Sequence, residues 1–307
     1  MITIPETDLV VHPLCLGTNV FGWSADEAQS HQVLDAYASN GGNFLDTADV
    51  YSQWKPGNQG GESETIIGKW LTKRDRSKIV VATKVSMLST RPGLSAKNIL
   101  AACDESLQRL QTDYIDIYYS HRDEIETPME ETLGAYAELI AAGKVRYIAA
   151  SQHTGARLQQ ALDISEANGL PSYIGLQDQY NLIYREPFES EQQPVLAKNH
   201  LSALPFYGLA RGFLSGKYRP GLKVESVRAE GVAEFYNDKN WAVLAKVREI
   251  AAELNAPVAA VSLAWLRTNP QVSTPIASAR TVEQLEEIVQ IVELSDDQLA
   301  SLNSLSA

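Results

Sequence analysis

The sequence predicts a (β/α)8 barrel with long βα loops at its C-terminal face. Short apolar runs alternate with stretches of helical spacing along all 307 residues, and polar side chains close several of the runs. This length is common for an α/β barrel built as one domain. A doubly wound sheet is the alternative, but it usually carries a glycine-rich first turn, and no G-x-G-x-x-G follows the first strand. We therefore expect a single barrel domain over residues 1–307.

Eight short apolar runs that end in polar or small residues predict the strands of the barrel. Their apolar character is typical of parallel strands that are buried on both faces. The runs span residues 12–17, 43–46, 79–84, 114–121, 145–151, 173–177, 201–206 and 272–277.

Each of these runs is followed by residues with helical spacing. The predicted helices span residues 26–40, 63–74, 95–110, 129–143, 156–168, 191–200, 240–268 (as two helices) and 282–292. Ser63 and Ser95 suit N-cap positions, and Gly143 and Gly169 suit the C-terminal ends of helices.

Two connections, residues 52–61 and 213–239, interrupt the regular spacing. The βα loops of a barrel build its active-site face, so long connections at these places favour a functional role. Side chains in βα loops that are candidates for lining a substrate pocket are Trp23, Trp54, Met87 and Tyr236.

Charge and composition exclude several classes of function. The net charge is −12 and the acidic residues are spread along the chain, which argues against nucleic-acid or anionic-membrane partners. Cys15 and Cys103 indicate neither a disulfide framework nor a metal cluster. The N-terminus lacks the pattern of a signal peptide, and the longest apolar stretch, near 257–266, is too short to span a bilayer. We expect a cytoplasmic protein without a metal; the sequence does not indicate its oligomeric state.

Four polar residues are the candidate catalytic group. Asp46, Lys84 and His121 each close a strand-like run, and Tyr51 follows the first of these runs. Because the carboxyl ends of all barrel strands meet at one face, we expect the four side chains to form one site.

The chemistry of these side chains suggests carbonyl reduction or enolisation. A tyrosine titrates near pH ~10, and a nearby ammonium group lowers that pKa. A buried lysine keeps its charge only beside a carboxylate, so Asp46, Lys84 and Tyr51 form a consistent set with Tyr51 as the proton donor. His121 adds a donor that can orient a carbonyl oxygen, and reduction then needs a hydride source. Two alternatives remain open: Lys84 as a Schiff-base lysine, and His121 as a structural histidine.

Several segments resemble the aldo-keto reductase family. The likeness rests first on G-G-N-F-L-D-T-A-D-V-Y (41–51), A-T-K (82–84) and Y-Y-S-H-R-D (118–123), and it continues through residues 60–71, 177–182, 205–218 and 275–286. The resemblance implies an enzyme that reduces an aldehyde or ketone with NADPH, with NADH possible, and without a metal. It implies Tyr51 as the general acid, Lys84 and Asp46 as the groups that tune it, and His121 as the residue that orients the substrate. An alternative is a nucleotide-sensing role like that of the potassium-channel β-subunits, which resemble the same family.

The resemblance also implies a set of cofactor-binding residues: Thr18, Asn19, Asp46, Ser151, Gln152, Gln177, Phe206, Tyr207, Gly208, Leu209, Arg211, Gly212, Ser278, Arg280 and Gln284. Ser151, Gln152 and Gln177 would hold the nicotinamide carboxamide, and Phe206 would stack on its ring. The backbone of residues 207–212, assisted by Arg211, would follow the pyrophosphate.

The adenosine end would be held by Ser278, Arg280 and Gln284, with the N-terminus of the following helix offered to the phosphate. We base the preference for NADPH on Arg280, although it could instead pair with Glu283 or Glu287. The sequence departs from the family at Gln152, where an asparagine is usual, and at Ile288, where many members have an asparagine.

Overall fold

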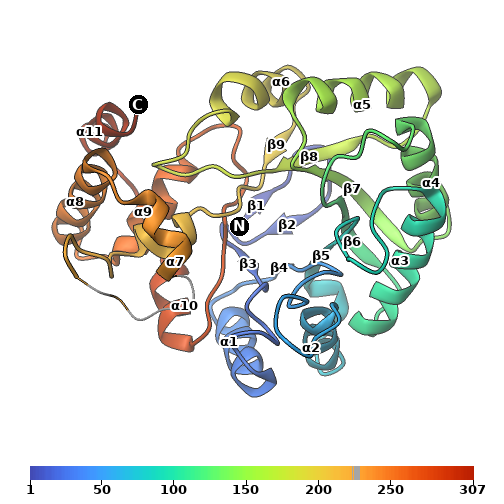
Figure 1. Ribbon diagram of the computed structural model, residues 1–307, viewed down its shortest axis with the longest axis horizontal. Coiled ribbons are helices and arrows are strands. Elements are labelled where there is room, and N and C mark those ends of the chain that lie inside the picture. The colour runs from blue at the N-terminus through green and yellow to red at the C-terminus, as the bar shows by residue number, and fades with distance from the viewer. Residues whose placement is uncertain (223, 225–228) are drawn as a thin grey trace.

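The computed structural model describes residues 1–222, 224 and 229–307 (Figure 1). At its centre lies a sheet of eight strands in the order β10-β3-β4-β5-β6-β7-β8-β9, and all neighbouring strands are parallel. The strands are β3 (Cys15–Gly17), β4 (Phe44–Asp46), β5 (Val80–Val85), β6 (Ile115–Ser120), β7 (Val145–Ser151), β8 (Tyr173–Gln177), β9 (Ser202–Ala203) and β10 (Ile276–Ala277).

The two edges of this sheet meet, as a barrel requires. Ala203 of β9 forms a parallel bridge with Val272, and its amide donates to the carbonyl of Gln271 at 2.6 Å. The amide of Ile276 in β10 donates to the carbonyl of Pro205 at 2.8 Å. The sheet therefore curls into the predicted (β/α)8 barrel, although β3, β9 and β10 are shorter than the apolar runs that predicted them.

Alternation along β5 explains why the strands are apolar on both faces. Val80 and Ala82 pack in a cluster inside the barrel, whereas Val81 and Val85 pack in the larger cluster between sheet and helices. Lys84 has the same parity as Val80 and Ala82, so its side chain points inward.

A hairpin that the sequence did not predict closes the N-terminal end of the barrel. It consists of β1 (Ile2–Thr3) and β2 (Val10–Val11), which pair antiparallel. Ile4, Leu9 and Val11 pack against side chains at the beginnings of the barrel strands, such as Phe44 and Val80. Figure 1 shows the hairpin in the middle of the ring of strands and helices. The polar residues that end the strands lie at the opposite, C-terminal end of the barrel.

Helices surround the sheet (Figure 1). They are α1 (Glu27–Ser39), α2 (Glu62–Leu71), α3 (Ala96–Leu110), α4 (Met129–Ala141), α5 (Gly155–Asn168), α6 (Gln193–Lys198), α7 (Ala229–Val232), α8 (Asp238–Glu253), α9 (Val258–Arg267), α10 (Val282–Ile288) and α11 (Asp296–Ser306). The predicted helices are present with shifted ends. α11, which packs against α8, was not predicted.

The helix ends test the predicted caps. The Ser95 hydroxyl caps α3, and Gly169 ends α5 in the left-handed conformation, both as expected. Gly143 lies one residue beyond the C-cap of α4. The prediction for Ser63 was wrong, because Gly61, with φ +81°, is the N-cap of α2.

The loop 52–61 is described throughout, but residues 223 and 225–228 of the predicted loop 213–239 lie outside the described residues. Among the helices that the structure describes, none is both long and apolar enough to cross a membrane.

Candidate active site

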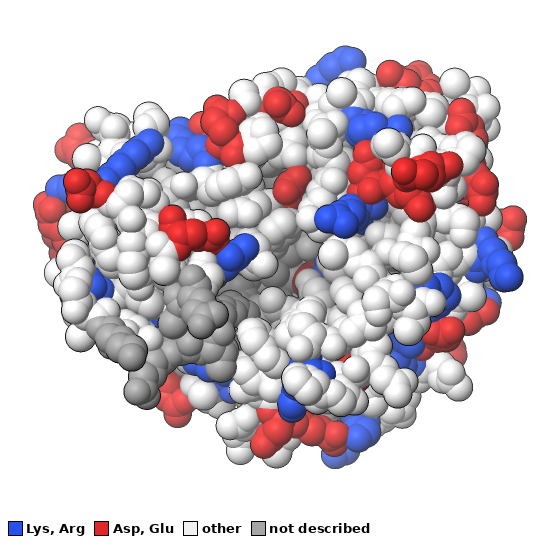
Figure 2. Space-filling model, viewed as in Figure 1, with Lys and Arg blue, Asp and Glu red and all other residues white. Residues whose placement is uncertain are grey.

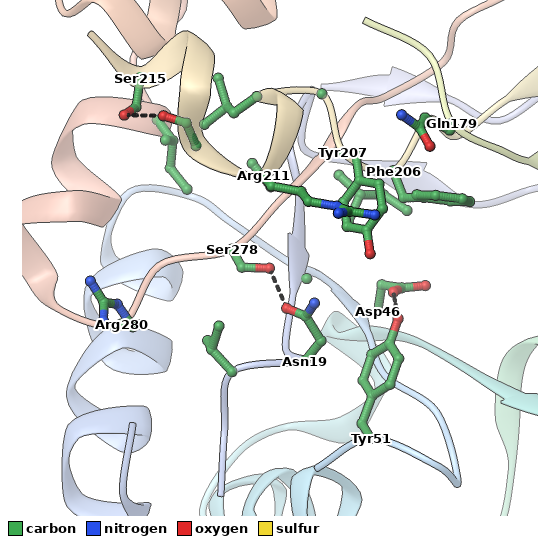
Figure 3. Close-up of a pocket in the computed structure, with 18 of the residues that line it drawn as sticks. Asn19, Asp46, Tyr51, Gln179, Phe206, Tyr207, Arg211, Ser215, Ser278 and Arg280 are labelled. Atoms are coloured by element: carbon green, nitrogen blue, oxygen red, sulfur yellow. Dashed lines mark hydrogen bonds between the residues drawn. The ribbon is translucent and has the colours of Figure 1, made fainter. Parts of the chain in front are cut away.

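The structure brings the four predicted side chains together at the C-terminal ends of β4, β5 and β6. Asp46 ends β4, Lys84 is the next-to-last residue of β5, and His121 directly follows β6. The Lys84 Nζ donates to Asp46 Oδ2 at 2.7 Å and to the Tyr51 hydroxyl at 2.9 Å. The Tyr51 hydroxyl in turn donates to Asp46 Oδ2 at 3.2 Å (Figure 3).

Hydrogen bonds use all the capacity of the Lys84 ammonium group. Besides its bonds to Asp46 and Tyr51, Nζ donates to the carbonyl of Thr47 at 2.7 Å, which accounts for its three protons. The side chain is fully buried, and this burial lowers the pKa of Lys84, while the Asp46 carboxylate acts in the opposite direction. Gln177 steadies the carboxylate from its other side by donating to Asp46 Oδ1 at 2.8 Å.

The direction expected for the Tyr51 pKa was wrong. Burial is the largest cause, and together with the Asp46 carboxylate it raises the pKa of Tyr51 well above the usual range. The sequence argument considered the ammonium group of Lys84 but not the loss of solvent or the contact between phenol and carboxylate. The phenol therefore remains protonated at neutral pH, which is the form that a proton donor needs.

His121 is a neutral imidazole beside the phenol. Burial, followed by the charges of Lys84 and Arg122, lowers the pKa of His121 well below its usual range. Its ring meets the Tyr51 ring edge-on, with centroids 5.9 Å apart, and only 8% of the residue is exposed. Within the described part of the chain, no group forms a hydrogen bond to the ring, and Nδ1 is buried without a partner.

A cavity of about 910 Å³ opens from this cluster. Asp46, Tyr51 and His121 line one end, and the cavity continues to Arg280 and Gln284 at the N-terminus of α10. Figure 2 shows the face of the molecule hollowed at its centre, and Figure 3 shows side chains from well-separated segments around the same space. Lys84 is not part of the wall, because it lies behind Asp46 and Tyr51.

Fourteen of the predicted cofactor residues line this cavity: Asn19, Asp46, Ser151, Gln152, Gln177, Phe206, Tyr207, Gly208, Leu209, Arg211, Gly212, Ser278, Arg280 and Gln284. Thr18 lies outside the lining. It is fully buried, and its hydroxyl donates to the carbonyl of Asp46 at 2.8 Å, so it supports the end of β4.

Some lining groups already have protein partners. The Ser278 hydroxyl donates to Asn19 Oδ1 at 2.8 Å (Figure 3). Arg211 forms an ion pair with Glu234 at 2.7 Å and lies over the Tyr207 ring. The Arg211 guanidinium is therefore neutralised by the protein itself.

Other lining groups are free of protein partners among the described residues. The Ser151 hydroxyl is buried and forms no hydrogen bond. The Arg280 guanidinium makes no ion pair with Glu283 or Glu287, the alternative considered from the sequence. Ser151 and Arg280 lie near opposite ends of the cavity, so both can meet one elongated ligand.

Two of the four loop side chains predicted to line a substrate pocket, Trp54 and Met87, line this cavity, and 47% of Trp54 is exposed. Trp23 does not line the cavity but packs edge-on against Trp54. Tyr236 lies away from the lining.

The sequence did not single out Val20, Gln179 or Ser215, which also line the cavity. Gln179 carried one usable signal, its place two residues after Gln177 at the end of β8. Among the described residues, no cluster of His, Cys, Asp or Glu is arranged to hold a metal.

Comparison with known proteins places the chain in a family. Residues 13–307 match the family model "Aldo/keto reductase family". The "Uncharacterized oxidoreductase YrpG" of Bacillus subtilis is 35% identical over 98% of this chain and 94% of its own length. "Protein tas" of Escherichia coli is 32% identical over 98% and 96%, respectively. A "Probable voltage-gated potassium channel subunit beta" of Arabidopsis thaliana is 31% identical over 94% and 90%. The chain belongs to the aldo/keto reductase family of NAD(P)H-dependent oxidoreductases.

Proposed function

We propose that this enzyme uses NADPH to reduce an aldehyde or ketone to an alcohol, with Tyr51 as the proton donor. The observation that carries the proposal is the set of Asp46, Lys84 and Tyr51, hydrogen-bonded to one another at the end of the cavity and beside His121.

The residues around the cavity suit a nicotinamide dinucleotide. The unpartnered Ser151 hydroxyl would hold the carboxamide together with the amides of Gln152 and Gln177, and Phe206 would lie against the ring. Arg280 would hold the phosphate that distinguishes NADPH from NADH, since a guanidinium binds phosphate oxygens with paired hydrogen bonds. When bound, the cofactor supplies the hydride.

Tyr51 and His121 would act on the carbonyl oxygen of the substrate. The phenol donates its proton to that oxygen, and the neutral imidazole donates a hydrogen bond that orients it. Lys84 Nζ already donates to the Tyr51 oxygen, so it stabilises the negative charge left there when the proton departs. Asp46 keeps Lys84 charged despite its burial.

The variant Tyr51→Phe tests the proton donor. Phenylalanine keeps the ring but removes the hydroxyl, so turnover of a simple aldehyde should fall by about 10²–10⁴-fold, whereas the dissociation constant for NADPH should change little. Steady-state kinetics and fluorescence titration measure the two quantities. Tyr184→Phe, at an exposed site away from the cavity, is the matched control. Full activity of Tyr51→Phe would contradict the proposed mechanism.

A second candidate function is nicotinamide-nucleotide sensing with little turnover, for which the similarity to a potassium-channel subunit is weak support. That role predicts tight retention of the cofactor and negligible repeated turnover. A steady-state assay with simple aldehydes separates it from the reductase.

The Schiff-base alternative predicts a substrate adduct on Lys84 that borohydride traps without nicotinamide. The engagement of all three Nζ protons in hydrogen bonds disfavours it, because a Schiff base requires an uncharged, accessible amine.

A further inference from the structure

The imidazole of His121 has no hydrogen bond of its own to hold it among the described residues. Its backbone is fixed instead. The His121 amide donates to the carbonyl of Val85 at 2.9 Å, and the His121 carbonyl accepts from Gln152 Nε2 at 2.9 Å. The direction of the ring therefore depends on these two backbone bonds and on the edge-on contact with Tyr51.

The backbone of Gln152 is itself held in place. Gln152 directly follows β7 and has a left-handed backbone with φ +53°, an uncommon conformation for a residue other than glycine. Its amide donates to the carbonyl of Gln177 at 3.1 Å, which ties it to the end of β8. The backbone thus aims the side chain across the cavity wall at the end of β6.

We propose that Gln152 is a positioning residue for His121: its amide nitrogen holds the His121 carbonyl and thereby sets the imidazole beside the Tyr51 hydroxyl. This inference rests on the proposed carbonyl reduction. A carbonyl oxygen only accepts hydrogen bonds, so the amide of Gln152 must present its nitrogen to His121. The Gln152 nitrogen is therefore fixed toward His121, which leaves the Gln152 Oε1 to accept a hydrogen bond from the NH2 of a bound carboxamide.

The length of the side chain matters for this role. Asparagine is shorter by one methylene, about 1.5 Å, and a bond of 2.9 Å lengthened by that amount is no longer a hydrogen bond. The residue usual in the family at this position would therefore leave the His121 carbonyl without its partner, unless the backbone moved.

The variant Gln152→Asn separates positioning from cofactor binding. If Gln152 positions His121, kcat for a simple aldehyde should fall by about 10–10²-fold, because small misplacements of a catalytic donor are costly. The dissociation constant for NADPH, measured by fluorescence titration, should change less than about twofold. An unchanged kcat would overturn the inference, and so would weaker NADPH binding as the only change. Gln108→Asn, at an exposed site in α3, is the control and should change neither quantity.

The variant Gln152→Glu adds a second measurement, the pH dependence of kcat, which a simple loss of packing would not change. A carboxylate cannot donate to the His121 carbonyl, whereas a protonated carboxyl group can. The ratio of variant to wild-type kcat should therefore rise as the pH falls toward the pKa of the new side chain, which burial raises above its ordinary value of about 4.3. A ratio that stays constant with pH would contradict the positioning role.

An additional measurement distinguishes failure of this inference from failure of the proposed function. The ¹⁵N resonances of the His121 imidazole, assigned with His121→Ala, should shift in Gln152→Asn and stay unchanged in Gln108→Asn. If the wild type reduces no carbonyl compound, the proposed function fails, and the resonances alone decide whether Gln152 positions His121. If the wild type is active and Gln152→Asn alters neither kcat nor the resonances, only the present inference fails.

Discussion

Asp49 is a buried carboxyl group that the proposed reaction does not use. It lies in the loop between Asp46 and Tyr51 with only 1% of its surface exposed, and no side chain of the described residues donates a hydrogen bond to either oxygen. Burial, followed by repulsion from Glu64, raises the pKa of Asp49 to about 7, while Arg109 and Arg91 act in the opposite direction. The loop that carries Tyr51 thus contains a carboxyl group whose pKa lies near neutral pH.

The consequence for stability can be tested with Asp49→Asn. An unfolded chain releases the Asp49 proton near pH ~4, whereas the folded chain keeps it until about pH 7. The wild type therefore loses stability from this group as the pH rises from about 4 to 7, and asparagine avoids that loss. The variant should be more stable than the wild type by about 2–4 kcal/mol at pH 8 and nearly equal to it at pH 4. Urea denaturation at both pH values measures the difference, and a difference independent of pH would refute the assignment.

At the residue scale, the grouping of the candidate site residues was predictable where each residue lies at the end of a predicted strand. Asp46, Lys84 and His121 were found because they end consecutive parallel strands, and register then brings such ends together. The pKa of Tyr51 was not predictable, because it depends on how much solvent the fold removes. The bond from Gln152 to His121 depends on a left-handed backbone that no short sequence pattern indicates.

At the scale of elements, the close approach of α2 to α3 depends on a glycine. A Cβ atom at Gly68 would lie 2.1 Å from the carbonyl oxygen of Arg109 and 2.9 Å from Leu110 Cα, and both are backbone atoms of α3 that cannot simply rotate away. Beside this contact, Arg109 Nε of α3 forms an ion pair at 2.7 Å with the buried Glu64 carboxylate of α2. The small residue therefore sets the distance between the two helices.

The variant Gly68→Ala should destabilise the protein by about 1–3 kcal/mol or more, because overpacking forces the helices apart. Gly134→Ala in α4 is the matched control. A Cβ there meets nothing within 4 Å, so alanine should stabilise the helix by about 0.5–1 kcal/mol. Chemical denaturation of both variants measures these effects. If Gly68→Ala has the same free energy of unfolding as the wild type, the helix contact tolerates the added methyl group.

Elements were predictable in proportion to their length and periodicity. β5 and α3 have long, clear patterns and were placed to within a residue or two. β1 and β2 have two residues each, which is too short for a visible alternation, so the hairpin was missed. Ser63 looked like a cap because of its residue type, but its hydroxyl donates to the carbonyl of Thr18 at 2.9 Å, a contact distant in sequence.

At the scale of the whole molecule, the two ends of the barrel differ: one is closed by apolar packing, and the other carries the candidate site. The hairpin closes one end with apolar side chains, and the cavity occupies the other. We propose that residues 1–307 fold as a single domain around this barrel. That proposal predicts one cooperative thermal transition, which a bound ligand shifts as a whole.

Cofactor binding should therefore appear as a shift of that single transition. A ligand at 100 times its dissociation constant stabilises the folded state by about 2.7 kcal/mol, roughly 5 °C in Tm for a chain of this size. NADPH should give this shift at lower concentration than NADH, because Arg280 lines the far end of the cavity without an ion-pair partner among the described residues. In Arg280→Ala the advantage of NADPH should disappear, while the shift with NADH remains. Differential scanning calorimetry with each cofactor measures both shifts. An unchanged preference in the variant would mean that another group recognises the 2′-phosphate, and two separate transitions would contradict the single domain.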